Sequence, residues 1–116
     1  MFVEDYVRLN CTMTDRERQL LKQEVYVQHE LPTWDELKED LQAQGFVIVS
    51  CDDMTQPWRG FVRARHTEYA QNMERHQQLH GTESANALRT FYKAVDELFQ
   101  GGRLGGRAYT VEKPLR

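Results

Sequence analysis

One stretch of the chain, residues 46–51, limits the possible folds more than any other. It reads Phe-Val-Ile-Val-Ser-Cys and lies between Gly45 and the acidic pair Asp52-Asp53. An unbroken apolar run of this length between polar residues predicts a strand. Because the run does not alternate with polar residues, we expect burial on both faces. That pattern is typical of a largely parallel sheet with helices on both sides.

The rest of the sequence supplies only two more strands for that sheet. β-branched and aromatic residues predict a strand over 2–7, and a last strand is expected over 107–112. Helical patterns fill the intervals, which gives the alternation of the α/β class. Three strands alone cannot form a doubly covered sheet. We therefore expect residues 1–116 to form a single half-domain whose first and last strands belong to a larger sheet.

Two copies of one capping pattern mark the starts of the first two helices. Thr14 with Glu17, and Thr33 with Glu36, follow the T-x-x-E spacing. In this spacing each side chain binds a backbone N–H at the start of the helix. Gly45 is expected to end the second of these helices as a C-cap.

Two longer helices are expected over 57–79 and 83–99, within a helical segment 57–100. The first begins at a proline, which is favoured in the first turn. The second carries apolar residues at the i, i+3, i+4, i+7 spacing of a helix with one buried face. Phe91 and Tyr92 belong to that stripe and are interpreted as core.

The charge balance and the cysteines exclude several classes of function. The 116 residues carry 15 Lys and Arg against 18 Asp and Glu, so an overall basic surface for nucleic acid is absent. No apolar run approaches the roughly 18 residues of a membrane span, and the N-terminus does not read as a secretory signal. Cys11 and Cys51 lack a basic or helix-start setting that would activate a thiolate, and are interpreted as structural. We expect a cytoplasmic protein with no nucleic-acid and no membrane partner.

The order of five segments along the chain resembles that of a known enzyme family. The segments are FVEDY, LPTWDELKEDLQAQGF, the strand that ends in DDMT, the helical pair led by Trp58, and FQGGRLGGRAYTVEKP. Together they resemble the C-terminal half of class I S-adenosylmethionine-dependent methyltransferases. The closer likeness is to the small-molecule type that methylates amines such as sarcosine, dimethylglycine or phosphoethanolamine. The resemblance covers nearly the whole chain.

The resemblance implies a partial Rossmann-like methyltransferase sheet of about three strands with about four helices. FVEDY would be the fifth strand of the full sheet, FVIVSCDDM the sixth and RAYTVEKP the seventh. The sixth and seventh strands would form the antiparallel edge of that sheet.

The resemblance also implies S-adenosylmethionine as the cofactor, but only together with an N-terminal half that is missing here. In the family, that half supplies a glycine-rich loop after the first strand and an acidic residue that holds the ribose. Glycine lets the backbone approach a cofactor closely. Here Gly101-Gly102 and Gly105-Gly106 precede a strand instead of joining a strand to a helix. Both pairs are therefore interpreted as turns, and no cofactor-binding residue is expected in the chain.

Asp5 and Tyr6 are the first candidates for the acceptor site. They are expected near the C-terminal end of the first strand, where open α/β sheets bind ligands. The resemblance implies that the aspartate faces the acceptor, holds an amine by charge and orients its lone pair toward the methyl group. The alternative is a solvated strand end.

Trp58, Arg65 and Tyr69 are the second set of substrate-binding candidates. Spacings of seven and four residues place them on one side of a helix. The aromatic pair could cover an alkylated amine by cation–π attraction, and Arg65 could pair with a carboxylate or phosphate of the acceptor. The alternative places Trp58 and Tyr69 in the core and Arg65 at its rim.

The histidines of the helical segment do not predict a metal site. His76 and His80 are one turn apart, a spacing that can bind zinc, and His66 precedes them. No third ligand stands at a convincing spacing, so we predict that the chain binds no metal.

These observations favour the acceptor-side part of a small-molecule methyltransferase, catalytically inactive when isolated from its cofactor half. A small-molecule amine would be the substrate, and another polypeptide or a second copy of the chain would complete the sheet. The alternative is a non-enzymatic interaction or dimerisation module derived from a methyltransferase. A third reading is a stand-alone α/β ligand-binding domain, which requires the three strands to pair among themselves.

Overall fold

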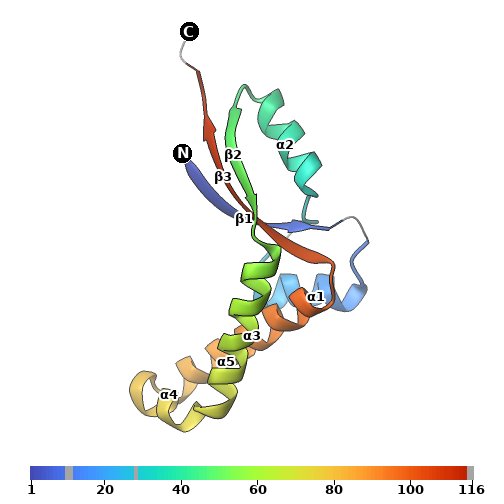
Figure 1. Ribbon diagram of the computed structural model, residues 1–116. Coiled ribbons are helices and arrows are strands. Elements are labelled where there is room, and N and C mark those ends of the chain that lie inside the picture. The colour runs from blue at the N-terminus through green and yellow to red at the C-terminus, as the bar shows by residue number, and fades with distance from the viewer. Residues whose placement is uncertain (10–11, 28, 115–116) are drawn as a thin grey trace.

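The computed structural model describes residues 1–9, 12–27 and 29–114 (Figure 1). Its strands and helices follow one another in the order β1 (Phe2–Arg8), α1 (Asp15–Glu24), α2 (Trp34–Ala43), β2 (Val47–Asp53), α3 (Thr55–Gln71), α4 (Met73–His80), α5 (Thr82–Gln100) and β3 (Leu104–Glu112). The predicted α/β class and its three strands are confirmed. The prediction for Cys11 lies outside the described residues.

The three strands form one sheet in which β3 lies between β1 and β2. β3 runs antiparallel to both neighbours, and Arg107 is paired with Asp5 on one side and with Asp53 on the other. The antiparallel edge expected for the last two strands is therefore confirmed. The expectation that β2 pairs in a largely parallel arrangement is wrong, because its hydrogen-bonded neighbour in the described chain is the antiparallel β3.

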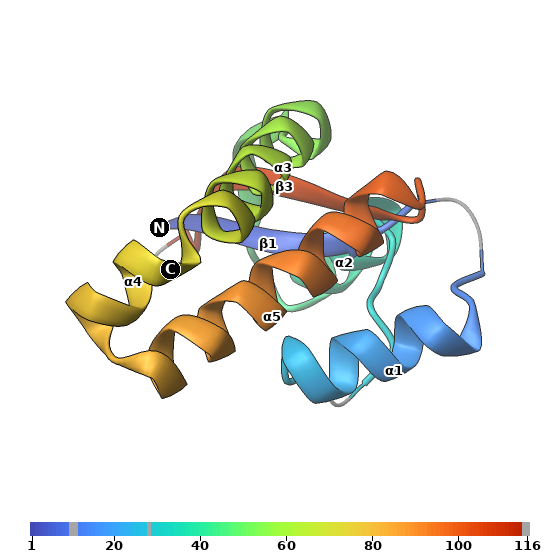
Figure 2. The same cartoon turned by 90° about the horizontal axis from the view of Figure 1, so that it is seen from below.

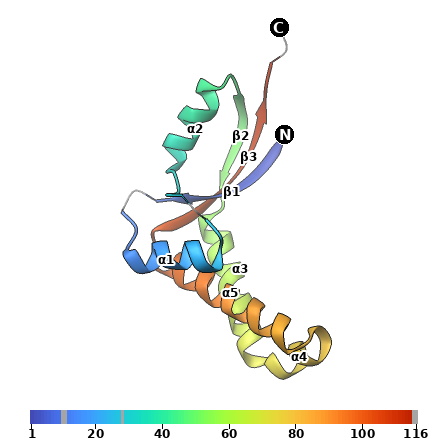
Figure 3. The same cartoon turned by 180° about the vertical axis from the view of Figure 1, so that it is seen from behind.

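β2 is an exposed edge strand, which contradicts the expected burial on both of its faces. Val47 and Val49 are 50% and 56% exposed. Figures 1 and 3 show α2 along one face of the sheet, and the opposite side of β2 has no helix over it. The apolar run predicted the strand correctly. The burial of a strand depends on the elements that cover it, and the sequence of the strand alone does not identify those elements.

β3 begins at Leu104, before the predicted start, because Gly105 and Gly106 belong to the strand. The predicted flexible turn at these two glycines is wrong. Both are paired with β1, and the ring of Trp58 fills the space that a Cβ on Gly106 would need. The glycines therefore allow α3 to approach the sheet closely.

Both predicted capping boxes are present. The Glu17 carboxylate accepts the Thr14 N–H at 2.9 Å, and the Thr14 hydroxyl accepts the Glu17 N–H at 3.1 Å. Thr33 and Glu36 make the same reciprocal pair at the start of α2. Gly45 follows α2 with a φ of 90°, as a residue that ends a helix often does.

The single helix predicted over 57–79 is two helices, so the described residues hold five helices rather than about four. The first begins at Thr55 and the break falls at Asn72, whose φ of −120° and ψ of 29° are not helical. The Asn72 side chain donates to the backbone oxygen of Glu68 at 3.1 Å. Asparagine offers the backbone such local alternatives to helical hydrogen bonds, which explains why the helix ends here.

The core lies where α5 crosses the sheet. Figure 2 shows α5 between α1 and α3. Leu98 and Phe99 are almost fully buried, and each contributes on the order of 2 kcal/mol by burial. The buried cluster is formed by Met13, Leu21, Leu31, Val62, Val95, Leu98, Phe99 and Leu104.

The far halves of α3 and α5 extend away from the sheet with α4 at their tip (Figures 1 and 3). The molecule is consequently elongated, with principal extents of 55 × 30 × 24 Å. Over the described ranges, none of the helices has the length and apolar character that crossing a membrane requires.

Candidate functional site

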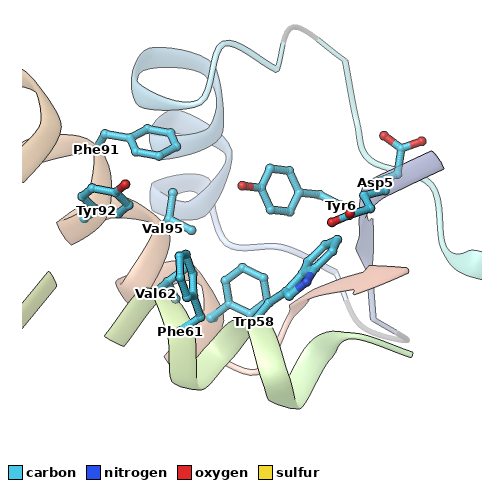
Figure 4. A pocket seen from close by; sticks show the side chains of 10 residues that line it. Asp5, Tyr6, Trp58, Phe61, Val62, Phe91, Tyr92 and Val95 are labelled. Atoms are coloured by element: carbon cyan, nitrogen blue, oxygen red, sulfur yellow. The ribbon is translucent and has the colours of Figure 1, made fainter. Parts of the chain in front are cut away.

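A cavity of about 500 Å³ opens between β1, α3 and α5 (Figure 4). Most of its wall is aromatic or aliphatic, and its two charged side chains are carboxylates from β1. The lining residues are Glu4, Asp5, Tyr6, Trp58, Phe61, Val62, Phe91, Tyr92, Val95 and Phe99. This size suits a small molecule.

The rings at the sheet end of the cavity are held by edge-to-face packing. The centroid of the Tyr6 ring lies 6.1 Å from that of Trp58, at an interplanar angle of 82°. It lies 6.2 Å from the centroid of the Phe99 ring, at an angle of 65°. Such arrangements place the positive edge of one ring against the negative face of another. Figure 4 shows the Tyr6 ring reaching from β1 toward the side of the cavity formed by Phe91 and Val95. The positions of these three rings are therefore fixed by their mutual packing, and all three residues lie in helices or strands rather than in loops.

Burial raises the pKa of the Tyr6 phenol above its ordinary value, and the neighbouring Tyr92 adds to this rise. The phenol therefore stays protonated at neutral pH and offers an O–H donor. At this end, the cavity presents the Tyr6 hydroxyl near the acidic residues Glu4 and Asp5 of the same strand.

Asp5 and Tyr6 lie in the middle of β1, not at its end, because the strand continues to Arg8. Asp5 accepts a hydrogen bond from the Tyr109 hydroxyl at 3.0 Å. Tyr109 is buried and packs on Trp34 of α2, with ring centroids 5.2 Å apart. Burial and the Asp5 carboxylate raise the pKa of Tyr109 to about 12. The Asp5 carboxylate thus bonds a side chain on the α2 face of the sheet.

Arg65 and Tyr69, which the sequence spacing placed on the same side of a helix as Trp58, are not among the described residues that line the cavity. The Arg65 guanidinium lies over the Phe61 ring at 5.2 Å from its centroid. Tyr69 is 7% exposed and stacks on His76 at 3.9 Å. It also contacts the Tyr92 ring at 5.2 Å, so it supports the cavity wall from behind.

Two of the three histidines of the helical segment lie against carboxylates, and the third, His80, stacks on the His76 ring with the centroids 6.1 Å apart. His76 Nε2 lies 2.8 and 2.9 Å from the two carboxylate oxygens of Glu68. His66 Nδ1 lies 2.7 Å from Asp96 Oδ2. Within the described ranges there is no group of three or more His, Cys, Asp or Glu side chains placed to hold a metal ion.

Sequence reasoning missed Glu4 and Phe61 as lining residues and assigned Phe91 and Tyr92 to the core. Phe91 and Tyr92 are half-buried and form part of the cavity wall. Strand alternation, which places Glu4 and Tyr6 on one face, could have identified Glu4. The three-residue step from Trp58 to Phe61 could likewise have identified Phe61.

Cys51 has a basic neighbour, contrary to the sequence interpretation. Arg107 Nη1 donates to the Cys51 sulfur at 3.6 Å. The same guanidinium lies 3.7 Å from the Asp53 carboxylate and over the Trp34 ring at 5.4 Å. Arg107 therefore links β2, β3 and α2 on the face of the sheet opposite Trp58.

No protein-family model matches the chain, and no curated protein matches its sequence. Solved structures do match. A phosphoethanolamine N-methyltransferase from Haemonchus contortus, solved with phosphomonomethylethanolamine and S-adenosylhomocysteine, matches at a TM-score of 0.77 and 14% identity, over 98% of this chain and 26% of that one. A mycolic acid cyclopropane synthase, solved with S-adenosylhomocysteine and CTAB, matches at a TM-score of 0.73 and 15% identity. This match covers 97% of this chain and 44% of that one. A cyclopropane synthase from Mycobacterium tuberculosis matches at a TM-score of 0.71 and 12% identity, and this match covers 95% of this chain and 42% of that one.

These matches concern the fold, and they confirm the predicted methyltransferase-like arrangement of strands and helices. The chain spans less than half the length of each of these three structures. It therefore corresponds to one part of their fold.

Proposed function

We propose that this chain is the acceptor-side part of an S-adenosylmethionine-dependent methyltransferase that acts on a small-molecule amine. The aromatic cavity between β1, α3 and α5 carries the proposal, because it is a preformed small-molecule site in a methyltransferase-like fold. The Haemonchus contortus enzyme was solved with phosphomonomethylethanolamine, which is itself a small amine derivative.

The described residues do not fit the cofactor. Gly101 and Gly102 end α5, and Gly102 has a φ of 77° typical of a helix-ending turn. Gly105 and Gly106 lie inside β3 with Thr55 and Trp58 against them, so this pair forms no open cradle. Two of the matching structures hold S-adenosylhomocysteine. In our proposal, S-adenosylmethionine is bound by the rest of the fold, and this chain alone transfers no methyl group.

The contribution of this chain is to bind and orient the acceptor. Aromatic walls exclude water from the amine, and the Tyr6 hydroxyl provides a fixed donor at one end of the cavity. Positioning of this kind accounts for a large part of the rate of a two-substrate reaction.

The experiment pairs the chain with the polypeptide segment that carries a glycine-rich cofactor half, whether fused or separate. Transfer of a labelled methyl group is then measured for sarcosine, dimethylglycine, phosphoethanolamine and dimethylethanolamine, the last of which carries no acidic group. We expect transfer by the pair and none by either part alone. A pair that assembles and binds S-adenosylmethionine but methylates none of these amines would contradict the proposal.

A second candidate function is a non-enzymatic interaction or dimerisation module. It is favoured by β1, whose outer edge is unpaired within the described chain, and by Phe2 at 63% exposure on that strand. Light scattering with circular dichroism distinguishes the possibilities. A folded monomer would favour a self-sufficient ligand-binding domain, whereas obligate association would favour a sheet that a second polypeptide completes.

A further inference from the structure

We infer that Glu4, and not Asp5, is the carboxylate that makes the cavity selective for a cationic alkylammonium group. The inference rests on the proposed function and specifies the charge of the acceptor form that the cavity binds. A protonated amine bound there must release its proton to solvent before its nitrogen lone pair can accept the methyl group. It replaces Asp5, the residue that the sequence pattern selected, with its neighbour on the strand.

The register of β1 places Glu4 on the cavity face of the sheet. Successive side chains of a strand point to opposite faces, so Glu4 and Tyr6 share one face. Tyr6 pairs with Gly106, the glycine against which Trp58 packs, and Glu4 pairs with Ala108. Glu4 therefore lies on the same face of the sheet as Tyr6 and lines the cavity from there.

The same alternation turns the Asp5 carboxylate toward the opposite face. Asp5 pairs with Arg107 across the strands and accepts the Tyr109 hydroxyl at 3.0 Å. Tyr109 and Arg107 both contact Trp34 of α2. One oxygen of the Asp5 carboxylate is thus engaged with Tyr109, although Asp5 is also among the residues that line the cavity.

Glu4, by contrast, makes no ion pair or hydrogen bond to any residue that the structure describes. Its side chain is exposed at the cavity rim. An unpaired carboxylate beside aromatic faces is the combination that attracts an alkylated ammonium ion, by charge and by cation–π interaction.

The lining also lacks a basic counterpart for an anionic group. No Lys, Arg or His lines this cavity among the described residues. The nearest candidate from the sequence, Arg65, lies over the Phe61 ring and is not part of the lining. The cavity therefore favours a net cation over an acceptor that carries a phosphate.

The test uses the full chain with Trp34→Phe, so that Trp58 is the only tryptophan and reports binding by its fluorescence. Choline is titrated against its neutral carbon isostere, dimethylbutanol, which has the same shape without the charge. Glu4→Gln is expected to weaken choline binding about fivefold, the scale of one partly exposed charge interaction. Binding of dimethylbutanol is expected to stay within about twofold.

Asp5→Asn is the matched control, because it removes the adjacent carboxylate on the same strand. Because Asp5 also lines the cavity, we expect a loss of choline affinity that is smaller than the loss of about fivefold in Glu4→Gln. A loss of choline affinity in Asp5→Asn equal to that in Glu4→Gln would overturn the inference. So would an equal loss of choline and dimethylbutanol in Glu4→Gln. Circular dichroism of each variant verifies that it is folded.

The experiment separates this inference from the proposed function. If the unsubstituted cavity binds choline and dimethylbutanol equally well, charge selection fails while the small-molecule site stands. If it binds neither ligand, both the acceptor cavity and the role of Glu4 are contradicted. Preferential binding of choline that disappears in Glu4→Gln supports both.

Discussion

The indole of Trp58 packs directly on Gly106, in the space where any other residue would carry its Cβ. This contact joins the first turns of α3 to the central strand of the sheet and fixes one wall of the cavity. The cavity wall therefore requires glycine at position 106, because any side chain there would displace the Trp58 ring.

Gly106→Ala is expected to displace the Trp58 ring and to lower the free energy of unfolding by about 1–3 kcal/mol, the usual cost of overpacking a filled site. Urea unfolding followed by far-ultraviolet circular dichroism measures the change in stability. In the Trp34→Phe background, where Trp58 is the only tryptophan, fluorescence reports the altered environment of its ring. Unchanged stability together with an unchanged emission spectrum would refute the contact.

Gly60→Ala serves as the control for that substitution. Gly60 lies in α3, and nothing is within 4 Å of the position where its Cβ would stand. Alanine is preferred over glycine inside a helix, so we expect a gain of about 0.5–1 kcal/mol in the same unfolding measurement. A loss at this position would mean that the α3 surface is covered by another segment.

The two capping boxes should differ in their contribution to stability. Glu17 is 6% exposed and its carboxylate also lies 3.7 Å from the Arg103 guanidinium, whereas Glu36 is exposed and pairs with Arg8 at 2.9 Å near the surface. Glu17→Ala leaves partly buried donors without an acceptor and is expected to cost about 1–3 kcal/mol. Glu36→Ala should cost less, because water replaces the lost carboxylate. Paired urea titrations compare the two variants, and equal losses would contradict the prediction.

Tyr109 should make the fold sensitive to alkaline pH. Its pKa is about 12 in the fold, against an ordinary value of 10.0. Because the fold favours the protonated phenol, this contribution to stability is complete below pH 10 and is lost as the pH rises toward 12. The free energy of unfolding should therefore fall more steeply over this interval in the unsubstituted chain than in Tyr109→Phe.

Tyr26→Phe is a suitable control for the pH experiment, since Tyr26 is 79% exposed. It should reproduce the pH dependence of the unsubstituted chain. The ultraviolet band of the phenolate provides an independent measurement, because the late-titrating tyrosine should disappear from the absorbance titration of Tyr109→Phe. An identical titration in both proteins would show that Tyr109 is not the group involved.

Local signals in the sequence predicted local structure well. The capping pairs that begin with Thr14 and Thr33 depend on residues three positions apart, so their geometry is decided within one turn. Gly45, predicted to end the second helix, likewise depends only on its local backbone conformation, with a φ of 90° after α2. The break at Asn72 was missed, because apolar spacing continues through it while a side-chain hydrogen bond to the backbone ends the helix.

Features that depend on distant neighbours could not be predicted in this way. The run that begins at Phe46 has the composition of a buried strand, yet β2 lies at an edge of the sheet. Gly105 and Gly106 resembled a turn because nothing in their own segment shows that Trp58 packs against them. Tyr69 shares a helix face with Trp58 by spacing, but that face meets different neighbours along its length, including His76.

The outer edge of β1 has a consequence for what the chain can pair with. If a second copy aligned antiparallel about Asp5, the two Asp5 carboxylates would stand opposite each other. A shift by one residue would set Glu4 against Asp5. Facing like charges in neighbouring strands are destabilising, and charged edge strands resist pairing with their own kind. These two registers are therefore disfavoured for a second copy of the chain, whereas other registers and a strand of different sequence do not bring these carboxylates together.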